Sequence, residues 1–308
     1  MRLYLVVNPR AKRASQRRAL VSTLKRVLGA STHIRCSGSI DELEEMACEC
    51  RQGEYEAVGI CGGDGTVHHT LSAFEREYGD DNLPPVLLLN GGTTNTVSHS
   101  IGLRGRPEVI ARRFRKAVEE DTLQTVSRST MREGQRLCFV FGVGMITRFQ
   151  HAVYAGSGQH GRWSAAGVIL HTMASTAVGG PFSRDLFSLW KGTLQVDGTQ
   201  LPHGSYTAVL AQTIENLALG FRPMYRALER PGTFHVIAGC MSGGEVLRKI
   251  PHLFWGKPIE GKGTYDDICA EIRLVPKGES EYSMDGDLYP MTEALVLRAG
   301  PEIRFFQI

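Results

Sequence analysis

The stretch Gly62-Gly63-Asp64-Gly65-Thr66 decides how the surrounding chain can fold. It follows an apolar run at residues 57–61, typical of a short buried strand, and precedes residues 67–71, which can begin a helix. A glycine-rich strand-to-helix turn lets the backbone approach a ligand and directs unpaired N–H groups at it, which favours a phosphate. Asp64 would repel a phosphate unless a cation or a sugar hydroxyl lay between them, so we expect a nucleotide–metal site. The alternative is an ordinary strand-to-helix turn without a ligand.

Apolar runs and helical patterns alternate from residue 1 to about residue 120. This alternation predicts a parallel sheet with helices on both faces, and we place a nucleotide-binding α/β domain at residues 1–125. The expected strands are 3–7, 33–36, 57–61 and 86–90, and the expected helices are 15–29, 41–51, 67–77 and 95–101.

Three turns at the ends of these predicted strands carry polar groups: Asn8-Pro9, residues 62–66 and residues 91–95. Ligands bind at the carboxyl ends of parallel strands, so the three turns together predict one binding crevice. Each turn alone has a second explanation, because Asn, Gly and Thr are also the usual cap and turn residues.

Beyond about residue 122 the pattern changes to runs of period two, which predict antiparallel strands. We therefore expect a mostly β substrate domain at residues 126–290, interrupted by helices near 145–155 and 162–178. In the run 268–275, alternate residues share one face of a single predicted strand. The last strands, 293–299 and 302–307, are expected to bring residues 291–308 back onto the first domain. The predicted strands of the second domain are 137–141, 194–196, 206–211, 234–238 and 268–275.

Composition narrows the function classes. The chain has 308 residues and a net charge of +3 with acids and bases interspersed, which fits two domains and gives no reason to expect nucleic acid as a partner. A basic group near the N-terminus could lie near phosphates or an anionic membrane surface, or form a solvated helix face. This group comprises Arg10, Lys12, Arg13, Arg17 and Arg18.

Cysteine use and hydropathy indicate the compartment. The seven cysteines are scattered and form no Cys-x-x-Cys pair, so neither a disulfide framework nor a zinc site is indicated and a reducing cytoplasm is expected. No run of about 18 apolar residues occurs, so any membrane contact would be peripheral. Nothing in the pattern specifies an oligomeric state.

The spacing of four motifs resembles the diacylglycerol kinase catalytic-domain family, which includes bacterial soluble lipid kinases and the sphingosine and ceramide kinases. The motifs are Asn8-Pro9, residues 62–66, residues 92–95 and residues 284–287, so the resemblance spans most of the chain. NAD kinases and phosphofructokinases share the Gly-Gly-Asp-Gly-Thr element, and the two later motifs narrow the resemblance to the lipid kinases.

This resemblance implies a two-domain kinase with an NAD-kinase-like α/β domain, a β-rich domain, nucleotide in the cleft and a lipid alcohol as acceptor. The matching residues would hold ATP and Mg²⁺, with Asp64 meeting the metal through the nucleotide. They are Asn8, Gly62, Gly63, Asp64, Gly65, Thr66, Gly92, Thr93, Thr94 and Asn95.

Asp285 and Asp287 match the pair that supplies the catalytic carboxylate in this family. In an extended segment residues i and i+2 point to one side, so both acids could face the acceptor, and one would gain a raised pKa and act as the base. We rank Asp285 ahead of Asp287. The alternative is a tight turn, because Asp-Gly is a common hairpin signal.

Two departures from the family pattern leave other functions open. Thr96 follows Asn95 where relatives carry Asp or a small residue, and residues 229–232 place Pro231 where some bacterial members bind a structural magnesium. Proline offers no ligand, so we expect that second metal to be absent. The alternative functions are a kinase of a soluble acceptor and a nucleotide-binding regulatory protein of weak activity.

Overall fold

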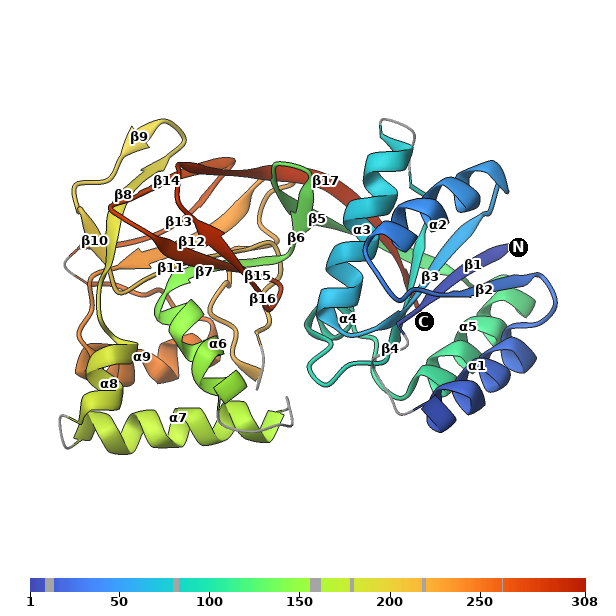
Figure 1. Cartoon of the computed structure of the whole chain (residues 1–308), viewed down its shortest axis with the longest axis horizontal. Coiled ribbons are helices and arrows are strands. Elements are labelled where there is room, and N and C mark those ends of the chain that lie inside the picture. Colours follow the sequence, from blue (N-terminus) through green and yellow to red (C-terminus); the bar gives the residue numbers. More distant parts are fainter. Residues whose placement is uncertain (9–13, 80–82, 156–161, 178–179, 218–219, 262) are drawn as a thin grey trace. The chain divides into compact units, whose positions relative to one another are not determined.

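The computed structural model describes residues 1–8, 14–79, 83–155, 162–177, 180–217, 220–261 and 263–308. Its tertiary contacts form two compact units (Figure 1). Unit 1 comprises residues 1–128, 135–137 and 302–308, and unit 2 comprises residues 129–134 and 138–301. Of the basic N-terminal group, Arg10, Lys12 and Arg13 and the Arg17 side chain lie outside the described residues, and Arg18 is an exposed residue of the first helix.

Unit 1 contains a parallel sheet with strand order β2, β1, β3, β4, followed by the end of β17. The helices α1 and α5 pack together on one face of this sheet, and α2 and α3 pack together on the other (Figure 1). The strands are β1 (Leu3–Val7), β2 (Thr32–Cys36), β3 (Ala57–Gly62) and β4 (Val86–Asn90). The helices are α1 (Ala14–Leu28), α2 (Asp41–Gln52), α3 (Asp64–Tyr78), α4 (Thr96–Ser100) and α5 (Pro107–Glu119).

Burial explains why these segments form strands and helices. Every residue of β1, β3 and β4 is buried, as expected for parallel strands covered on both faces, whereas the edge strand β2 is largely half-exposed. Helix α2 buries Leu43, Met46, Ala47 and Cys50, a spacing that places one apolar stripe against its neighbours.

Unit 2 contains two antiparallel sets of strands. One has the order β13, β12, β11, β7, β15, β16, and the other has the order β10, β8, β14, β17. A core of buried side chains from β7, β11 and β12 and from β8, β14 and β17 joins them face to face, and it includes Phe141, Phe234 and Ile272. Together with unit 1, this confirms the predicted fold class of an α/β domain and a mostly antiparallel β domain.

The strands in this part of the chain are β5 (Gln124–Glu133), β6 (Arg136–Cys138), β7 (Val140–Gly144), β8 (Trp190–Val196), β9 (Thr199–Gln200), β10 (Ser205–Tyr206), β11 (Ala208–Gln212), β12 (Phe234–Gly239), β13 (Thr264–Cys269), β14 (Glu271–Pro276), β15 (Ser280–Met284), β16 (Asp287–Met291) and β17 (Leu295–Gln307). The helices are α6 (Met145–Ala155), α7 (Arg162–Ala177), α8 (Pro181–Leu186) and α9 (Gly243–Trp255). No helix among the described residues is long and apolar enough to cross a membrane.

The predicted single strand at 268–275 is wrong. The chain breaks at Ala270, so that β13 and β14 join different sets of strands. The carboxylate of Asp197 accepts hydrogen bonds from the N–H groups of Ala270 (3.0 Å) and Glu271 (2.9 Å), which satisfies the backbone at the break. The two predicted final strands form one strand, β17, whose residues up to 301 lie in unit 2 and whose residues from 302 lie in unit 1.

Candidate functional site

Two glycine turns of unit 1 pack backbone against backbone. The N–H groups of Gly91 and Gly92 both donate to the Gly62 carbonyl, at 2.9 and 3.1 Å. A Cβ atom added at Gly92 would lie 2.3 Å from the Gly63 Cα, far inside van der Waals contact. Position 92 therefore requires glycine because the turn after β3 touches the turn after β4.

Helix α3 begins directly at this contact. Its N-cap residue, Gly63, has an extended backbone, and no side chain caps the helix. The N–H groups of the first turn, formed by Asp64, Gly65 and Thr66, have no acceptor within the helix, and the helix dipole makes this end positive. The start of α3 therefore offers the donors and the charge that a phosphate group needs.

Asn8 joins this site from the end of β1. Its side-chain Nδ2 donates to the Thr66 hydroxyl oxygen at 2.7 Å, and its backbone N–H donates to the Cys61 carbonyl at 3.0 Å. The structure thus brings together the ends of β1, β3 and β4 at one edge of the sheet, as the three polar turns predicted.

Asp64 lies in the first turn of α3 and contacts the start of α4. Its carboxylate accepts a hydrogen bond from the Thr96 hydroxyl at 3.2 Å and one from the Val97 N–H at 3.4 Å. The departure from the family at position 96 is therefore matched by a local contact, because Thr96 supplies a donor to Asp64. A carboxylate that accepts hydrogen bonds can also share an oxygen with a cation.

The Asn95 side chain stabilises the turn after β4 by hydrogen bonding to Gly92 within the same turn. Asn95 has the left-handed backbone conformation (φ 48°), which Asn tolerates better than most residues. Its side chain accepts from the Gly92 N–H at 3.1 Å and donates to the Gly92 carbonyl at 2.9 Å. Asn95 is buried, Thr94 is half-buried and Thr93 is exposed, so within this motif Thr93 is the most accessible side chain.

These residues fit a nucleotide phosphate with its magnesium. The cradle has no side chain at Gly63 or Gly92, it borders the first-turn N–H groups of α3, and one carboxylate lies beside it. That donor set suits a phosphate and a hard cation.

The Asp285-Gly286 segment of unit 2 is a two-residue hairpin turn. Met284 and Asp287 pair across the turn, and Asp285 and Gly286 have φ angles of 48° and 99°. Two consecutive positive φ angles define the tight turn that Asp-Gly favours. The expected extended segment with both carboxylates on one side is therefore wrong.

The Asp285 carboxylate is buried and engaged by backbone. It accepts hydrogen bonds from the N–H groups of Phe139 (3.1 Å) and Val140 (2.9 Å), and the Asp285 N–H donates to the Val140 carbonyl at 2.9 Å. Asp285 thereby ties the hairpin to the start of β7. Asp287, the first residue of β16, is half-buried.

Helix α6 holds this hairpin through a residue that the sequence analysis missed. The Tyr154 hydroxyl donates to the Gly286 carbonyl at 2.6 Å and accepts from Gln150 Nε2 at 3.1 Å. Burial raises the pKa of Tyr154, and the negative charge of Asp287 raises it further. The i, i+4 spacing of Gln150 and Tyr154 on a predicted helix was the available signal.

An apolar cavity lies beside β11 and β12, on the face of their sheet that α6 and α9 cover and opposite the core that joins the two sets of strands. Residues from α6, β11, β12 and α9 line it, and Lys249 and Thr207 are its polar members. The other lining residues include Met145, Ile146, Ala208, Leu210, Leu217, Phe221, Ile237, Met241, Val246 and Leu253. Cavities of this kind accept apolar ligand groups.

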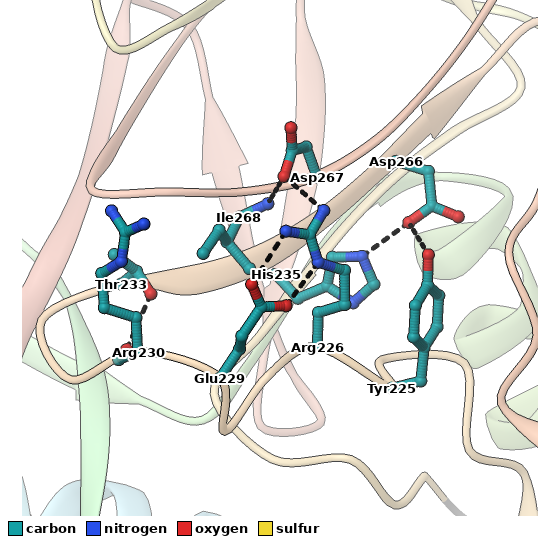
Figure 2. Close-up of polar contacts among 9 residues, drawn as sticks. All are labelled: Tyr225, Arg226, Glu229, Arg230, Thr233, His235, Asp266, Asp267 and Ile268. Atoms are coloured by element: carbon teal, nitrogen blue, oxygen red, sulfur yellow. Dashed lines mark hydrogen bonds and ion pairs between the residues drawn. The ribbon is translucent and has the colours of Figure 1, made fainter.

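The segment that carries Pro231 contains a charge cluster (Figure 2). Arg226 donates to both oxygens of Glu229, at 2.6 and 3.0 Å, and to Asp267 at 2.5 Å. Hydrogen bonding to Glu229 raises the pKa of Arg226, and the same contact lowers the pKa of Glu229. A guanidinium therefore neutralises both carboxylates.

A third carboxylate, Asp266, contacts His235 and Tyr225 (Figure 2). Asp266 accepts from the Ile259 N–H at 2.7 Å and from the Tyr225 hydroxyl at 3.3 Å, and His235 Nε2 lies 2.6 Å from it. His235 is fully buried, so this contact belongs to the interior of unit 2.

Comparison with known proteins agrees with the expected resemblance. Residues 2–126 match the model of the diacylglycerol kinase catalytic domain. A search of curated proteins found no match. The resemblance to this family is therefore confirmed through a domain that contains Asn8 and both glycine turns.

Solved structures share the fold over the whole chain. A diacylglycerol kinase from Bacillus anthracis str. Sterne has 13% identity and a TM-score of 0.65, with 100% of this chain and 97% of that chain covered. A candidate diacylglycerol kinase from the same strain has 14% identity and a TM-score of 0.71, with the same coverage. At these identities the likeness shows the fold alone.

Proposed function

Because residues 2–126 match a diacylglycerol kinase catalytic domain, we propose that the protein is an ATP-dependent lipid kinase. It transfers the γ-phosphoryl group to the hydroxyl of a diacylglycerol-like or other lipid alcohol. The structural observation that supports nucleotide binding is the pair of touching glycine turns at the start of α3.

Unit 1 would bind the nucleotide. The first-turn N–H groups of α3 would hold phosphate oxygens. The hydrogen bond from Asn8 to Thr66 would hold the end of β1 against this first turn. Bound Mg²⁺ would neutralise charge on the transferred phosphoryl group, and Asp64, which accepts a hydrogen bond from Thr96, would be the carboxylate that contacts it. Gly62, Gly63, Gly65 and Gly92 would let the backbone approach the phosphates, and Thr93, Thr94 and Asn95 would form the second wall of the site.

Unit 2 would bind the acceptor. The apolar cavity beside α9 would take an acyl or other hydrocarbon chain, because burial of apolar surface drives such binding. A purely soluble acceptor would gain little from a cavity with this lining.

Asp287 would accept the proton of the acceptor hydroxyl. Asp285 is already engaged by the N–H groups of Phe139 and Val140, so its role in the proposal is to position the turn. This order reverses the ranking drawn from the sequence. A carboxylate base at Asp287 is expected to contribute about two or more orders of magnitude to turnover.

The test is a transfer assay with ATP labelled at its γ-phosphate, Mg²⁺ and a panel of lipid extracts. We expect label in the organic phase and a phosphorylated lipid by mass spectrometry, and Asp287→Asn should remove both. Label on a soluble acceptor such as NAD would favour the alternative kinase. Nucleotide binding without transfer to any acceptor would favour the regulatory protein.

A further inference from the structure

The outward side of α9 exposes large apolar residues near its C-terminal end. Trp255 is 66% exposed and Phe254 is 44% exposed, and Pro251 is exposed one turn earlier. The inward side of the same helix lines the cavity with Val246 and Leu253. Helix α9 is therefore apolar on two sides, and one of them faces solvent.

The exposed rings form a cluster with a third aromatic residue. The Phe254 ring lies edge-on to Trp255, with centroids 6.1 Å apart, and edge-on to Phe221, with centroids 5.7 Å apart. Phe221, Phe254 and Trp255 are called the aromatic patch below. Single exposed apolar residues are normal, whereas contiguous ones mark interaction surfaces. Because Phe221 also lines the cavity, the patch is continuous with the cavity lining.

Basic residues flank the aromatic patch. Arg248 is exposed and lies seven residues before Trp255, on the same side of the helix, and Lys257 is exposed two residues after Trp255. Lys249, next to Arg248 in the sequence, lines the cavity. No acidic residue occurs from 246 to 259, and the flanking acids are Glu245, in the first turn of α9, and the exposed Glu260.

We propose that the aromatic patch and the basic residues Arg248, Lys249 and Lys257 form a docking surface for an anionic lipid bilayer. Tryptophan and phenylalanine rings settle at the boundary between headgroups and acyl chains. Lysine and arginine side chains reach anionic headgroups while their stems stay in apolar surroundings. The charge of the surface thus selects a bilayer over an uncharged apolar protein partner.

Docking here would also give a lipid a continuous apolar route. A hydrocarbon chain that leaves the bilayer beside Phe254 meets Phe221 next, and Phe221 belongs to the cavity wall. This delivery step rests on the proposed lipid kinase function, whereas docking itself does not.

Tryptophan fluorescence and vesicle sedimentation test the docking surface without ATP. The chain has three tryptophans, and a Trp163→Phe background leaves Trp190, which is buried, and Trp255. We expect vesicles of equal parts phosphatidylglycerol and phosphatidylcholine to shift the Trp255 emission to shorter wavelength. Brominated acyl chains in those vesicles should quench it, and phosphatidylcholine alone should have a much smaller effect.

Variants locate the surface. The double variant Phe254→Ser, Trp255→Ser should lower sedimentation with anionic vesicles by about tenfold or more. Arg248→Glu changes the charge by two units and should lower it by about tenfold or more at low salt. Val275→Ser, at another exposed apolar residue of unit 2, is the matched control and should bind as the wild type does.

Two results would overturn the proposal. One is sedimentation of the wild type that is absent, or unchanged in the double aromatic variant. The other is a shift of Trp255 emission with protein concentration in the absence of lipid, accompanied by a dimer in light scattering, which would assign the patch to self-association. Because no nucleotide is present, neither result depends on whether the protein is a kinase.

Discussion

The hydroxyl of Tyr154 donates a 2.6 Å hydrogen bond to the carbonyl of Gly286. Through this bond helix α6 supports the Asp285-Gly286 hairpin turn, which Asp287 directly follows. Because both acids are attached to the turn, its rigidity decides where the Asp287 carboxylate lies.

Tyr154→Phe keeps the ring and removes this bond. We expect kcat for lipid phosphorylation to fall by about fivefold, the equivalent of one hydrogen bond, with the KM for ATP unchanged. Tyr225→Phe, which loses a hydroxyl bonded to Asp266 elsewhere in unit 2, is the control and should keep its kcat. Equal kcat values for wild type and Tyr154→Phe would show that the turn needs no support from α6.

Asp285→Asn and Asp287→Asn should have different effects. In Asp285→Asn the new side-chain amide would turn an N–H donor toward the backbone donors of Phe139 and Val140, at a cost of about 1 to 3 kcal/mol in the free energy of unfolding. Asp287→Asn should melt near the wild-type temperature and lose about two or more orders of magnitude in kcat. Melting curves and kcat measured on both variants separate the roles, and a fully active Asp287→Asn would rule out Asp287 as the base.

Asp64→Asn should raise the magnesium concentration that turnover requires. An amide keeps one acceptor for Thr96 and Val97, so the free energy of unfolding should change by about 1 kcal/mol or less. The loss of charge should raise the Mg²⁺ concentration needed for half-maximal turnover. Thr96→Val breaks the contact and keeps the charge, so it serves as the control. An unchanged Mg²⁺ requirement in Asp64→Asn would remove Asp64 from the metal site.

Stability should fall in alkaline solution. Burial raises the pKa of Cys50 to about 11 and the pKa of Tyr206 to about 12. Because the folded pKa lies above the unfolded one, the contribution of each group is complete below the unfolded pKa and is lost as pH rises through the folded value. For Cys50 this loss begins near pH 9 and amounts to about 2 to 3 kcal/mol.

Urea unfolding from pH 8 to 11 measures this effect. Cys50→Ala should be less stable at pH 8 because it leaves a small cavity, and its midpoint should decline less steeply above pH 9. Parallel curves for wild type and Cys50→Ala would contradict the assignment of the alkaline loss to Cys50.

The first unit was readily predicted because its signals are local. Strands buried on both faces read as continuous apolar runs, and β1, β3 and β4 are such runs. The polar turns were placed together correctly because parallel strands end at one edge of a sheet. Two side-chain contacts could not be predicted from local sequence. They are the hydrogen bond between the Asn95 side chain and the Gly92 N–H, and the hydrogen bond from Thr96 to Asp64.

The second unit depends more on distant contacts. The break at Ala270 is stabilised by Asp197, about seventy residues earlier. The local period-two pattern continues across the break, so it predicted one strand where the structure has two. Helix α9 was missed because Pro251 lies inside it, although Ser242 and Glu245 form a capping box that a search for helix starts would find. The Asp-Gly turn was recognised as an alternative, and the burial of Asp285 against Phe139 and Val140 could be seen only in the structure.

Calorimetric titration of Mg-ATP tests most directly the central claim that the start of α3 binds nucleotide phosphates. Gly65→Val adds a side chain beside the first-turn N–H groups at a residue with a helical backbone, and Gly167→Val in α7 is the matched control with open space around it. We predict that the wild type and Gly167→Val bind Mg-ATP at one site, and that a folded Gly65→Val binds about tenfold or more weakly, the equivalent of about 1.4 kcal/mol. No binding heat in the wild type, or equal affinity in Gly65→Val, would contradict it.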